Sequence, residues 1–219
     1  MSAHLLVHAL VICNGEPPSR ALTRRLAHHA DLVVAADGGA NVARQYGIMP
    51  HVIIGDLDSI SKSTRRFFSS SIILHVNRQD NTDLEKALDY LVSQKARKAS
   101  VIGATGKRID FTLGNLSVLW AYTSHIDLTF MGDGWKAIPI ISRAQLRERI
   151  GTTVSLIPFG GCSGITLRGL QYPLINASMN VGQIGVSNVI RRSPFTVHVK
   201  KGHMLLLVMN TVRRTRRRT

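Results

Sequence analysis

The segment Val52-Ile53-Ile54-Gly55-Asp56-Leu57-Asp58-Ser59 decides how the rest of this chain is interpreted. Its apolar, β-branched start predicts a buried strand, and Gly55 permits a tight turn after which two aspartates leave the strand end together. Carboxylates that lie close together repel each other, so a positive charge is expected between them. Mg²⁺ is held by one or two carboxylates while substrate phosphates complete its shell. The alternative is structural: Asp56 caps the following turn and Asp58 caps the 61–68 segment.

Apolar runs alternate with helical patterns on both sides of this segment. Thr82 and Glu85 have the spacing of a capping box ahead of apolar residues at helical intervals. Alternation of strands and helices predicts an α/β domain with a mostly parallel sheet and flanking helices. The expected strands are 9–13, 32–36, one starting at 52, 72–76, 101–103 and 126–131, and the expected helices are 20–30, a short one ending at 46, one after Thr82, and 109–123.

Several aspartates follow the predicted strands. They are Asp37, Asp56, Asp58, Asp80 and Asp110. The ligand crevice of such a sheet lies beyond the carboxyl ends of its strands, so these side chains are expected at one edge. So many carboxylates would repel one another strongly unless they share cations. Asp83 is a further candidate, although an acid at that position also suits the dipole of the following helix.

The second part of the chain has a different texture, with short β-like runs separated by Gly and Pro. Strands are expected at 152–157, 164–167, 184–186, 196–199 and 204–208. These predict a smaller, all-β domain. We therefore divide the chain into an α/β domain at 1–131, an all-β domain at 132–212 and a basic tail at 213–219.

The charge distribution separates the same two parts. The 219 residues carry a net charge of +15. Residues 1–134 hold 14 Lys and Arg against 12 Asp and Glu, whereas residues 135–219 hold 14 against the single Glu148. The excess attracts polyanions such as nucleotides or nucleic acid without deciding between them. A solvated tail without a specific role is an equal alternative for 213–219.

The composition indicates a globular protein without a membrane span. The hydrophobic fraction is 44%, and no apolar run approaches the roughly 18 residues that a spanning helix needs. The two cysteines, Cys13 and Cys162, lie far apart and suggest no disulfide framework. A cytoplasmic location is the expectation.

The ordered motifs of the whole chain resemble the thiamine pyrophosphokinase family. They are Ala36-Asp37-Gly38-Gly39-Ala40-Asn41, Gly55-Asp56-Leu57-Asp58-Ser59, Gln79-Asp80-Asn81-Thr82-Asp83-Leu84-Glu85-Lys86-Ala87, Gly103-Ala104-Thr105-Gly106-Lys107-Arg108-Ile109-Asp110, Gly169-Leu170-Gln171-Tyr172-Pro173-Leu174 and Val186-Ser187-Asn188. One position departs from the pattern, because Phe111 stands where the fourth motif usually has His.

The resemblance implies an α/β domain joined to a smaller β-sandwich domain, a homodimer, a requirement for Mg²⁺, and thiamine bound between the two subunits. The implied reaction transfers the diphosphate of ATP, the co-substrate, to the hydroxyl of thiamine and releases AMP. Such a transfer needs alignment of the attacking and leaving oxygens and relief of negative charge.

The resemblance also assigns residues to roles. The catalytic residues implied are Asp56, Asp58, Asp83 and Asp110, of which Asp56, Asp58 and Asp83 bind the metal. Nucleotide binding falls to Asp37, Gly38, Gly39, Asn41, Asp80, Lys107 and Arg108. Thiamine contacts are Tyr172, Ser187 and Asn188. The structural alternatives are that Gly38-Gly39 only makes a turn, that Tyr172 belongs to the sandwich core and that Ser187-Asn188 is a turn. Arg78 and Lys86 offer positive charge to the triphosphate as well, and the alternative is that each is a solvated helix or loop charge.

Two rival functions remain open. One is a diphosphokinase or nucleotidyl-type enzyme that acts on another small alcohol, for which Phe111 leaves room. The other is a nucleic-acid-binding protein, suggested by the basic tail but disfavoured because the chain has no aromatic and basic motif of the common RNA modules.

Overall fold

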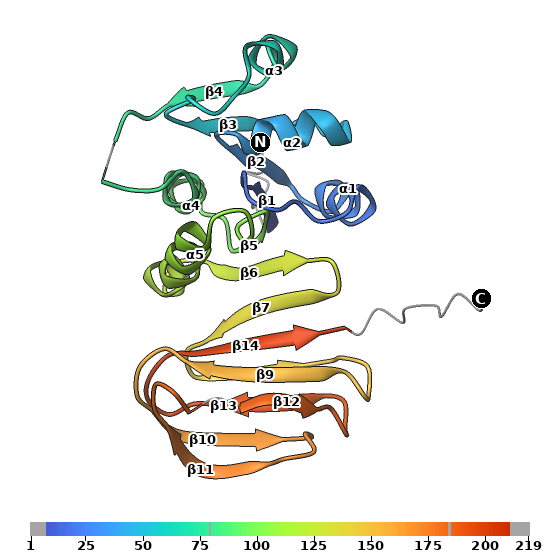
Figure 1. Cartoon of the computed structure of the whole chain (residues 1–219), viewed down its shortest axis with the longest axis vertical. Helices are drawn as coiled ribbons and strands as arrows, with labels where there is room; N and C mark the ends of the chain where they lie inside the picture. Colours follow the sequence, from blue (N-terminus) through green and yellow to red (C-terminus); the bar gives the residue numbers. More distant parts are fainter. Residues whose placement is uncertain (1–7, 79, 184, 211–219) are drawn as a thin grey trace, which may run out of the picture. The chain divides into compact units, whose positions relative to one another are not determined.

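A computed structural model of the chain describes residues 8–78, 80–183 and 185–210 (Figure 1). Contacts divide the chain into two compact units, Met1–Asp133 and Gly134–Thr219, and each is described by itself. The basic tail predicted at 213–219 and residues 211–212 of the predicted second domain lie outside the described residues.

The first unit contains a parallel sheet in which the strands lie in the order β6-β5-β1-β2-β3-β4. The strands are β1 (His8–Ile12), β2 (Leu32–Ala36), β3 (Val52–Gly55), β4 (Ile72–His75), β5 (Lys98–Ile102) and β6 (Asp127–Gly132). The central strands are apolar throughout because helices cover both faces of such a sheet. Leu10, Ile12 and Ile53 accordingly have no exposed surface or almost none.

In the described part of this unit, five helices flank the sheet. They are α1 (Arg20–His28), α2 (Gly39–Tyr46), α3 (Lys62–Phe67), α4 (Asp83–Ser93) and α5 (Ile109–Tyr122). A side chain caps the start of three of them, α1, α3 and α4. The capping box predicted for Thr82 and Glu85 is confirmed at the start of α4. Helix α3 is capped by the hydroxyl of Ser61. The alternative in which Asp58 caps that segment is therefore wrong.

The second unit is a sandwich of two antiparallel sheets, with strand orders β12-β9-β14-β7 and β11-β10-β13-β8. Its strands are β7 (Trp135–Ile140), β8 (Arg143–Leu146), β9 (Thr153–Pro158), β10 (Cys162–Arg168), β11 (Leu174–Met179), β12 (Gly185–Val189), β13 (Phe195–His198) and β14 (Met204–Met209). One buried cluster joins Val154 and Leu206 of the first sheet to Leu167 and Phe195 of the second. The predicted fold class, an α/β domain followed by an all-β sandwich, is confirmed.

Three strands of the sandwich are absent from the sequence prediction, and their composition explains why. Strand β7 contains Pro139, β8 is short and alternates with polar residues, and β11 exposes Ile175 and Asn176. Of the strand predicted at 184–186, residue 184 lies outside the described residues, and the other two residues belong to β12. Among the described residues, no helix is long and apolar enough to cross a membrane.

Candidate active site

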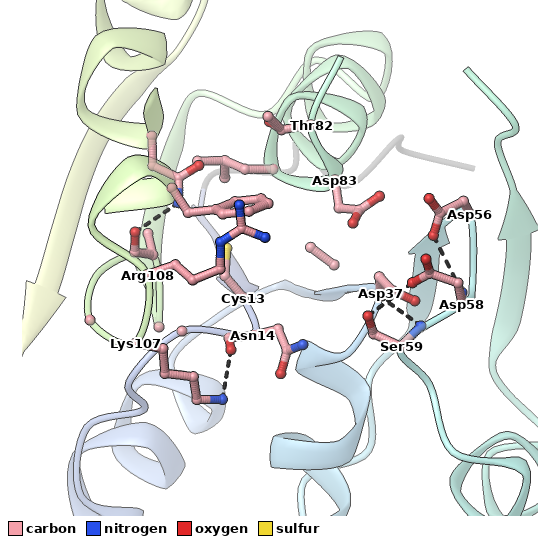
Figure 2. A pocket seen from close by; sticks show the side chains of 18 residues that line it. Cys13, Asn14, Asp37, Asp56, Asp58, Ser59, Thr82, Asp83, Lys107 and Arg108 are labelled. Carbon is pink, nitrogen blue, oxygen red and sulfur yellow. Dashed lines mark hydrogen bonds between the residues drawn. The ribbon is translucent and has the colours of Figure 1, made fainter. Parts of the chain in front are cut away.

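A cavity of about 530 Å³ lies in the first unit, beside the carboxyl ends of several strands and the starts of α4 and α5. Its size falls in the range of small-molecule sites. Figure 2 shows Asp37, Asp56 and Asp58 on one side of the cavity and Lys107 and Arg108 on the other. Because the opposed charges face a shared space, the cavity suits a ligand that carries both phosphates and a bound cation.

Asp37, Asp56 and Asp58 form an acid cluster, in which one carboxylate oxygen from each residue lies within 4.8 Å of the others. Asp37 directly follows β2, and Asp56 directly follows Gly55 at the end of β3. Two backbone amides fix the cluster: Ser59 N donates to Asp37 Oδ2 at 3.2 Å and Asp58 N donates to Asp56 Oδ1 at 3.3 Å. Asp56 thus takes part in a local turn and also faces the cavity.

The Asp37 carboxylate is poorly satisfied by protein groups alone. The residue is 3% exposed, and its Oδ1 is buried without a hydrogen-bond partner in the described part of the chain. Burial raises the pKa of this carboxyl, and the Asp83 and Asp58 carboxylates add to the effect against hydrogen bonds from Ser59 and Gly38. Because buried polar groups are normally paired, this oxygen indicates a missing partner. A hard divalent cation fits the all-oxygen donor set.

Gly55 allows the acids to approach one another. It has φ +156°, and an added Cβ would lie 2.8 Å from Asp37 Cβ and 3.1 Å from Asp83 Oδ1. The first contact is shorter than real Cβ atoms show and the second is tighter than most, so a side chain at this position would press on both acids. The glycine in the opening segment is therefore required by the site as well as by the turn.

Asp83 lines the same cavity at the start of α4, but its oxygens do not belong to the acid cluster. Lys86 donates to Asp83 Oδ1 over 2.9 Å, and the lysine is only 4% exposed. The alternative that makes Lys86 a solvated charge is therefore wrong. The ion pair fixes the position of the Asp83 carboxylate at the start of α4. Its role as a metal ligand stays a prediction.

Cys13 also lines the cavity, and the sequence analysis did not single it out. Burial, aided by the charge of Asp83, raises the pKa of its thiol to about 12. The thiol is therefore neutral at physiological pH and makes a poor nucleophile.

Asp80 and Asp110 do not join the other acids. Each pairs with an arginine two residues earlier, Asp80 with Arg78 and Asp110 with Arg108. The hydrogen bond from each arginine lowers the pKa of the neighbouring carboxyl. Both aspartates are exposed and neither is among the residues that line the cavity. Their predicted roles in nucleotide binding and catalysis stay predictions.

The predicted nucleotide-binding residues divide into two groups. Lys107 and Arg108 line the cavity, and Lys107 Nζ is anchored on the carbonyl of Asn14 at 2.8 Å. Gly39 instead packs against β1, because an added Cβ would lie 1.9 Å from the Ile12 carbonyl oxygen. A Cβ on Gly38 would lie 2.3 Å from Nδ2 of Asn14.

Asn41 holds the loop that carries the acid cluster. Its Nδ2 donates to the Ser59 carbonyl at 2.8 Å, and its Oδ1 accepts from Ser61 N at 3.1 Å. Both amide atoms are engaged with this loop. Asn41 thus stabilises the loop that carries the acid cluster without lining the cavity. Its predicted contact with the nucleotide stays a prediction.

The predicted thiamine contacts lie in the second unit. Tyr172 is 62% exposed, so the alternative that places it in the sandwich core is wrong. Asn188 is buried: its Oδ1 accepts from Tyr172 N at 3.0 Å and its Nδ2 donates to the Tyr172 carbonyl at 2.8 Å. Ser187 is exposed and has φ +60°. Asn188 therefore fixes the backbone that presents the tyrosine ring.

These features define a class: an α/β protein whose strand ends offer carboxylates for a cation and whose neighbouring loop offers basic side chains for phosphates. Two family models match the chain, the thiamin pyrophosphokinase catalytic domain at residues 23–130 and the thiamin pyrophosphokinase vitamin B1 binding domain at residues 142–204. The chain belongs to the thiamin pyrophosphokinase family.

Individual relatives agree with the family models. The chain is 31% identical to thiamine pyrophosphokinase 1 of Arabidopsis thaliana, with 87% of this chain and 82% of the relative covered. It is 29% identical to thiamine pyrophosphokinase of Bacillus subtilis over 80% of this chain and 86% of the relative.

The fold is shared with solved members of the family. The crystal structure of the Bacillus subtilis thiamine pyrophosphokinase matches with a TM-score of 0.83 at 22% identity, covering 94% of this chain and all of the other. The yeast thiamin pyrophosphokinase matches with a TM-score of 0.82 at 19% identity, covering 95% and 87%. At these identities the likeness establishes the fold, which extends over both units.

Proposed function

We propose that this chain is an enzyme that transfers the diphosphate of ATP to the primary hydroxyl of thiamine, giving thiamine diphosphate and AMP. The chain matches both family models, and its first unit contains a cavity with an acid cluster opposite Lys107 and Arg108. These two observations together carry the proposal. The relatives named above bear the name of this activity.

The proposed reaction is an in-line displacement at the β-phosphorus of ATP. The thiamine oxygen forms a bond to that phosphorus, and the bond between the phosphorus and the α,β-bridging oxygen breaks. AMP leaves with the bridging oxygen, and the hydroxyl proton passes to a carboxylate of the cavity. Lys107 and Arg108 bind phosphate oxygens, which aligns the triphosphate and offsets its charge.

The acid cluster supports Mg²⁺ as the cation of this site. Asp37, Asp56 and Asp58 would hold it, because they offer three oxygens in reach of one ion and one of those residues has an unpartnered buried oxygen. When bound, the ion would neutralise phosphate charge and polarise the phosphorus centre. Asp83 stands beside the cluster in a position fixed by Lys86.

An apolar stripe on α5 supports a homodimer. Residues on four successive turns share this face: Ile109 is 73% exposed, Leu113 is 60% exposed, and Leu116 and Trp120 are half-buried. Although most residues of this helix are apolar, within it only Asn115 and Leu119 are buried. Helices of this composition are normally covered, so a second copy of the chain is the proposed partner.

The exposed ring of Tyr172 supports a contact with thiamine, because an aromatic face binds flat and cationic rings. The nearby Ser187 adds an exposed hydroxyl. The cytoplasmic location and the nucleic-acid contact of the tail stay predictions.

The test is an incubation of purified protein with ATP, MgCl₂ and thiamine, with quantification of AMP and thiamine diphosphate and omission of each component in turn. Equal amounts of the two products, formed only when all components are present, are expected. AMP formation that does not require thiamine, or that appears only with another alcohol, would contradict thiamine as the acceptor.

A further inference from the structure

Two residues close in sequence, Asp110 and Phe111, hold Arg108 at the cavity. Its Nε donates to Asp110 Oδ1 at 3.1 Å, and a terminal nitrogen donates to the other oxygen of the same carboxylate. Its guanidinium carbon lies 4.3 Å from the centroid of the Phe111 ring. The two contacts fix both the plane and the direction of the guanidinium group.

The free edge of this arginine faces the cavity. Figure 2 shows Arg108 reaching into it from the side opposite Asp37 and Asp58. A guanidinium has five N–H donors in a planar fork, and the bonds to Asp110 use two of them, so three remain. Phe111 also lines the cavity and is 47% exposed, so its ring is held at the wall rather than in the core.

We propose that Phe111 is a positioning residue that acts through Arg108: its ring holds the guanidinium in the orientation that binds the triphosphate of ATP. This inference rests on the proposed function. An arginine ordered before the ligand arrives loses less side-chain freedom on binding, and stacking on an aromatic face is one way to order it.

A simpler role for Phe111 would be apolar packing at the start of α5. Leucine keeps the apolar volume and removes the aromatic face, whereas tyrosine keeps the face. The two substitutions Phe111→Leu and Phe111→Tyr therefore separate stacking from packing.

The chain offers a matched control in a second arginine stacked on a phenylalanine. The guanidinium carbon of Arg44 lies 5.2 Å from the ring centroid of Phe67, which is 56% exposed at the end of α3. Neither residue lines the cavity. Phe67→Leu thus removes a similar contact away from the site.

The experiment measures the Kd of ATP and of adenosine by calorimetry without thiamine, so it is independent of the acceptor. Phe111→Leu is expected to weaken ATP binding roughly two- to fivefold and to leave the Kd of adenosine unchanged. The Phe111→Tyr and Phe67→Leu variants are expected to bind ATP with the wild-type Kd. An unchanged ATP Kd in Phe111→Leu, or an equal loss for adenosine, would overturn the proposal.

A double-mutant cycle tests whether Phe111 acts through Arg108. In the Arg108→Met background, Phe111→Leu is expected to have no further effect on ATP binding, because the group that it positions is gone. Full additivity of the two substitutions would overturn the proposal. Failure of the proposed function appears separately, as wild-type protein that binds ATP but forms no thiamine diphosphate.

Discussion

Asp37→Asn should raise the stability of the metal-free protein and reduce its response to Mg²⁺. The wild-type carboxylate is 3% exposed, has an unpartnered oxygen and faces the charges of Asp58 and Asp83. An unsatisfied buried polar atom costs about 1–3 kcal/mol. The neutral amide removes the charge repulsion and can donate toward the neighbouring acids, so we expect a gain of about 1 kcal/mol in the free energy of unfolding, measured by urea denaturation in EDTA.

In the presence of Mg²⁺, the wild type should become more stable than Asp37→Asn. A ligand present at a hundredfold excess over its Kd stabilises the folded state by about 2.7 kcal/mol. If loss of one anionic ligand weakens Mg²⁺ binding roughly tenfold, the stabilisation by Mg²⁺ falls by about 1.4 kcal/mol. Asp80→Asn is the matched control, because that carboxylate is exposed and bound to Arg78, and its Mg²⁺ response should equal that of the wild type.

The pH dependence gives a second readout of the same substitution. Burial raises the pKa of Asp37 above its ordinary value of 3.8, so its ionisation opposes folding. The penalty is absent below pH 3.8, develops as the pH rises to the raised pKa, and is full above it. The advantage of Asp37→Asn in EDTA should therefore be present at pH 7 and shrink as the pH falls. A metal-free variant that is less stable than wild type at pH 7, with an unchanged Mg²⁺ response, would refute this reasoning.

Three further predictions concern the supports of the site. Gly55→Ala should lower the free energy of unfolding by about 1–3 kcal/mol, because its Cβ would press on Asp37; wild-type stability and Mg²⁺ response by urea denaturation would contradict the close approach. Thr82→Ala should cost about 1 kcal/mol by removing the α4 cap, and should lower the affinity for Mg²⁺ if Asp83 is a ligand; no change in the urea midpoint would count against the cap. Leu113→Glu should shift the protein from dimer to monomer in light scattering behind gel filtration, since it charges the apolar stripe of α5; an unchanged mass would remove this face from the interface.

The α/β fold and part of the acid cluster could be predicted from the sequence because both depend on local pattern. Buried strands read as continuous apolar runs, and residues after parallel strands meet at one edge. Asp37, Asp56 and Asp58 follow this rule and lie together. The α4 capping box follows from the spacing of two side chains and needs no tertiary information.

The remaining features depend on contacts that spacing does not encode. Asp80 and Asp110 also follow apolar runs, but in each case an arginine two residues earlier donates to the carboxylate. Lys86 reads as a surface lysine because nothing in the helical pattern distinguishes a side chain that folds back onto Asp83. Its spacing of three residues from that acid was the available signal, since such pairs adjoin on a helix.

The most direct test of the proposed transfer is the fate of phosphorus labels in ATP. Two parallel reactions with MgCl₂ and thiamine would use ATP radiolabelled on its β-phosphorus or on its γ-phosphorus, with nucleotides and thiamine phosphates separated by chromatography. Attack at the β-phosphorus predicts that both labels enter thiamine diphosphate and that unlabelled AMP is the only nucleotide product. Transfer of the γ-label alone, with labelled ADP from the β-labelled substrate, would contradict diphosphate transfer and the alignment that we assign to the cavity.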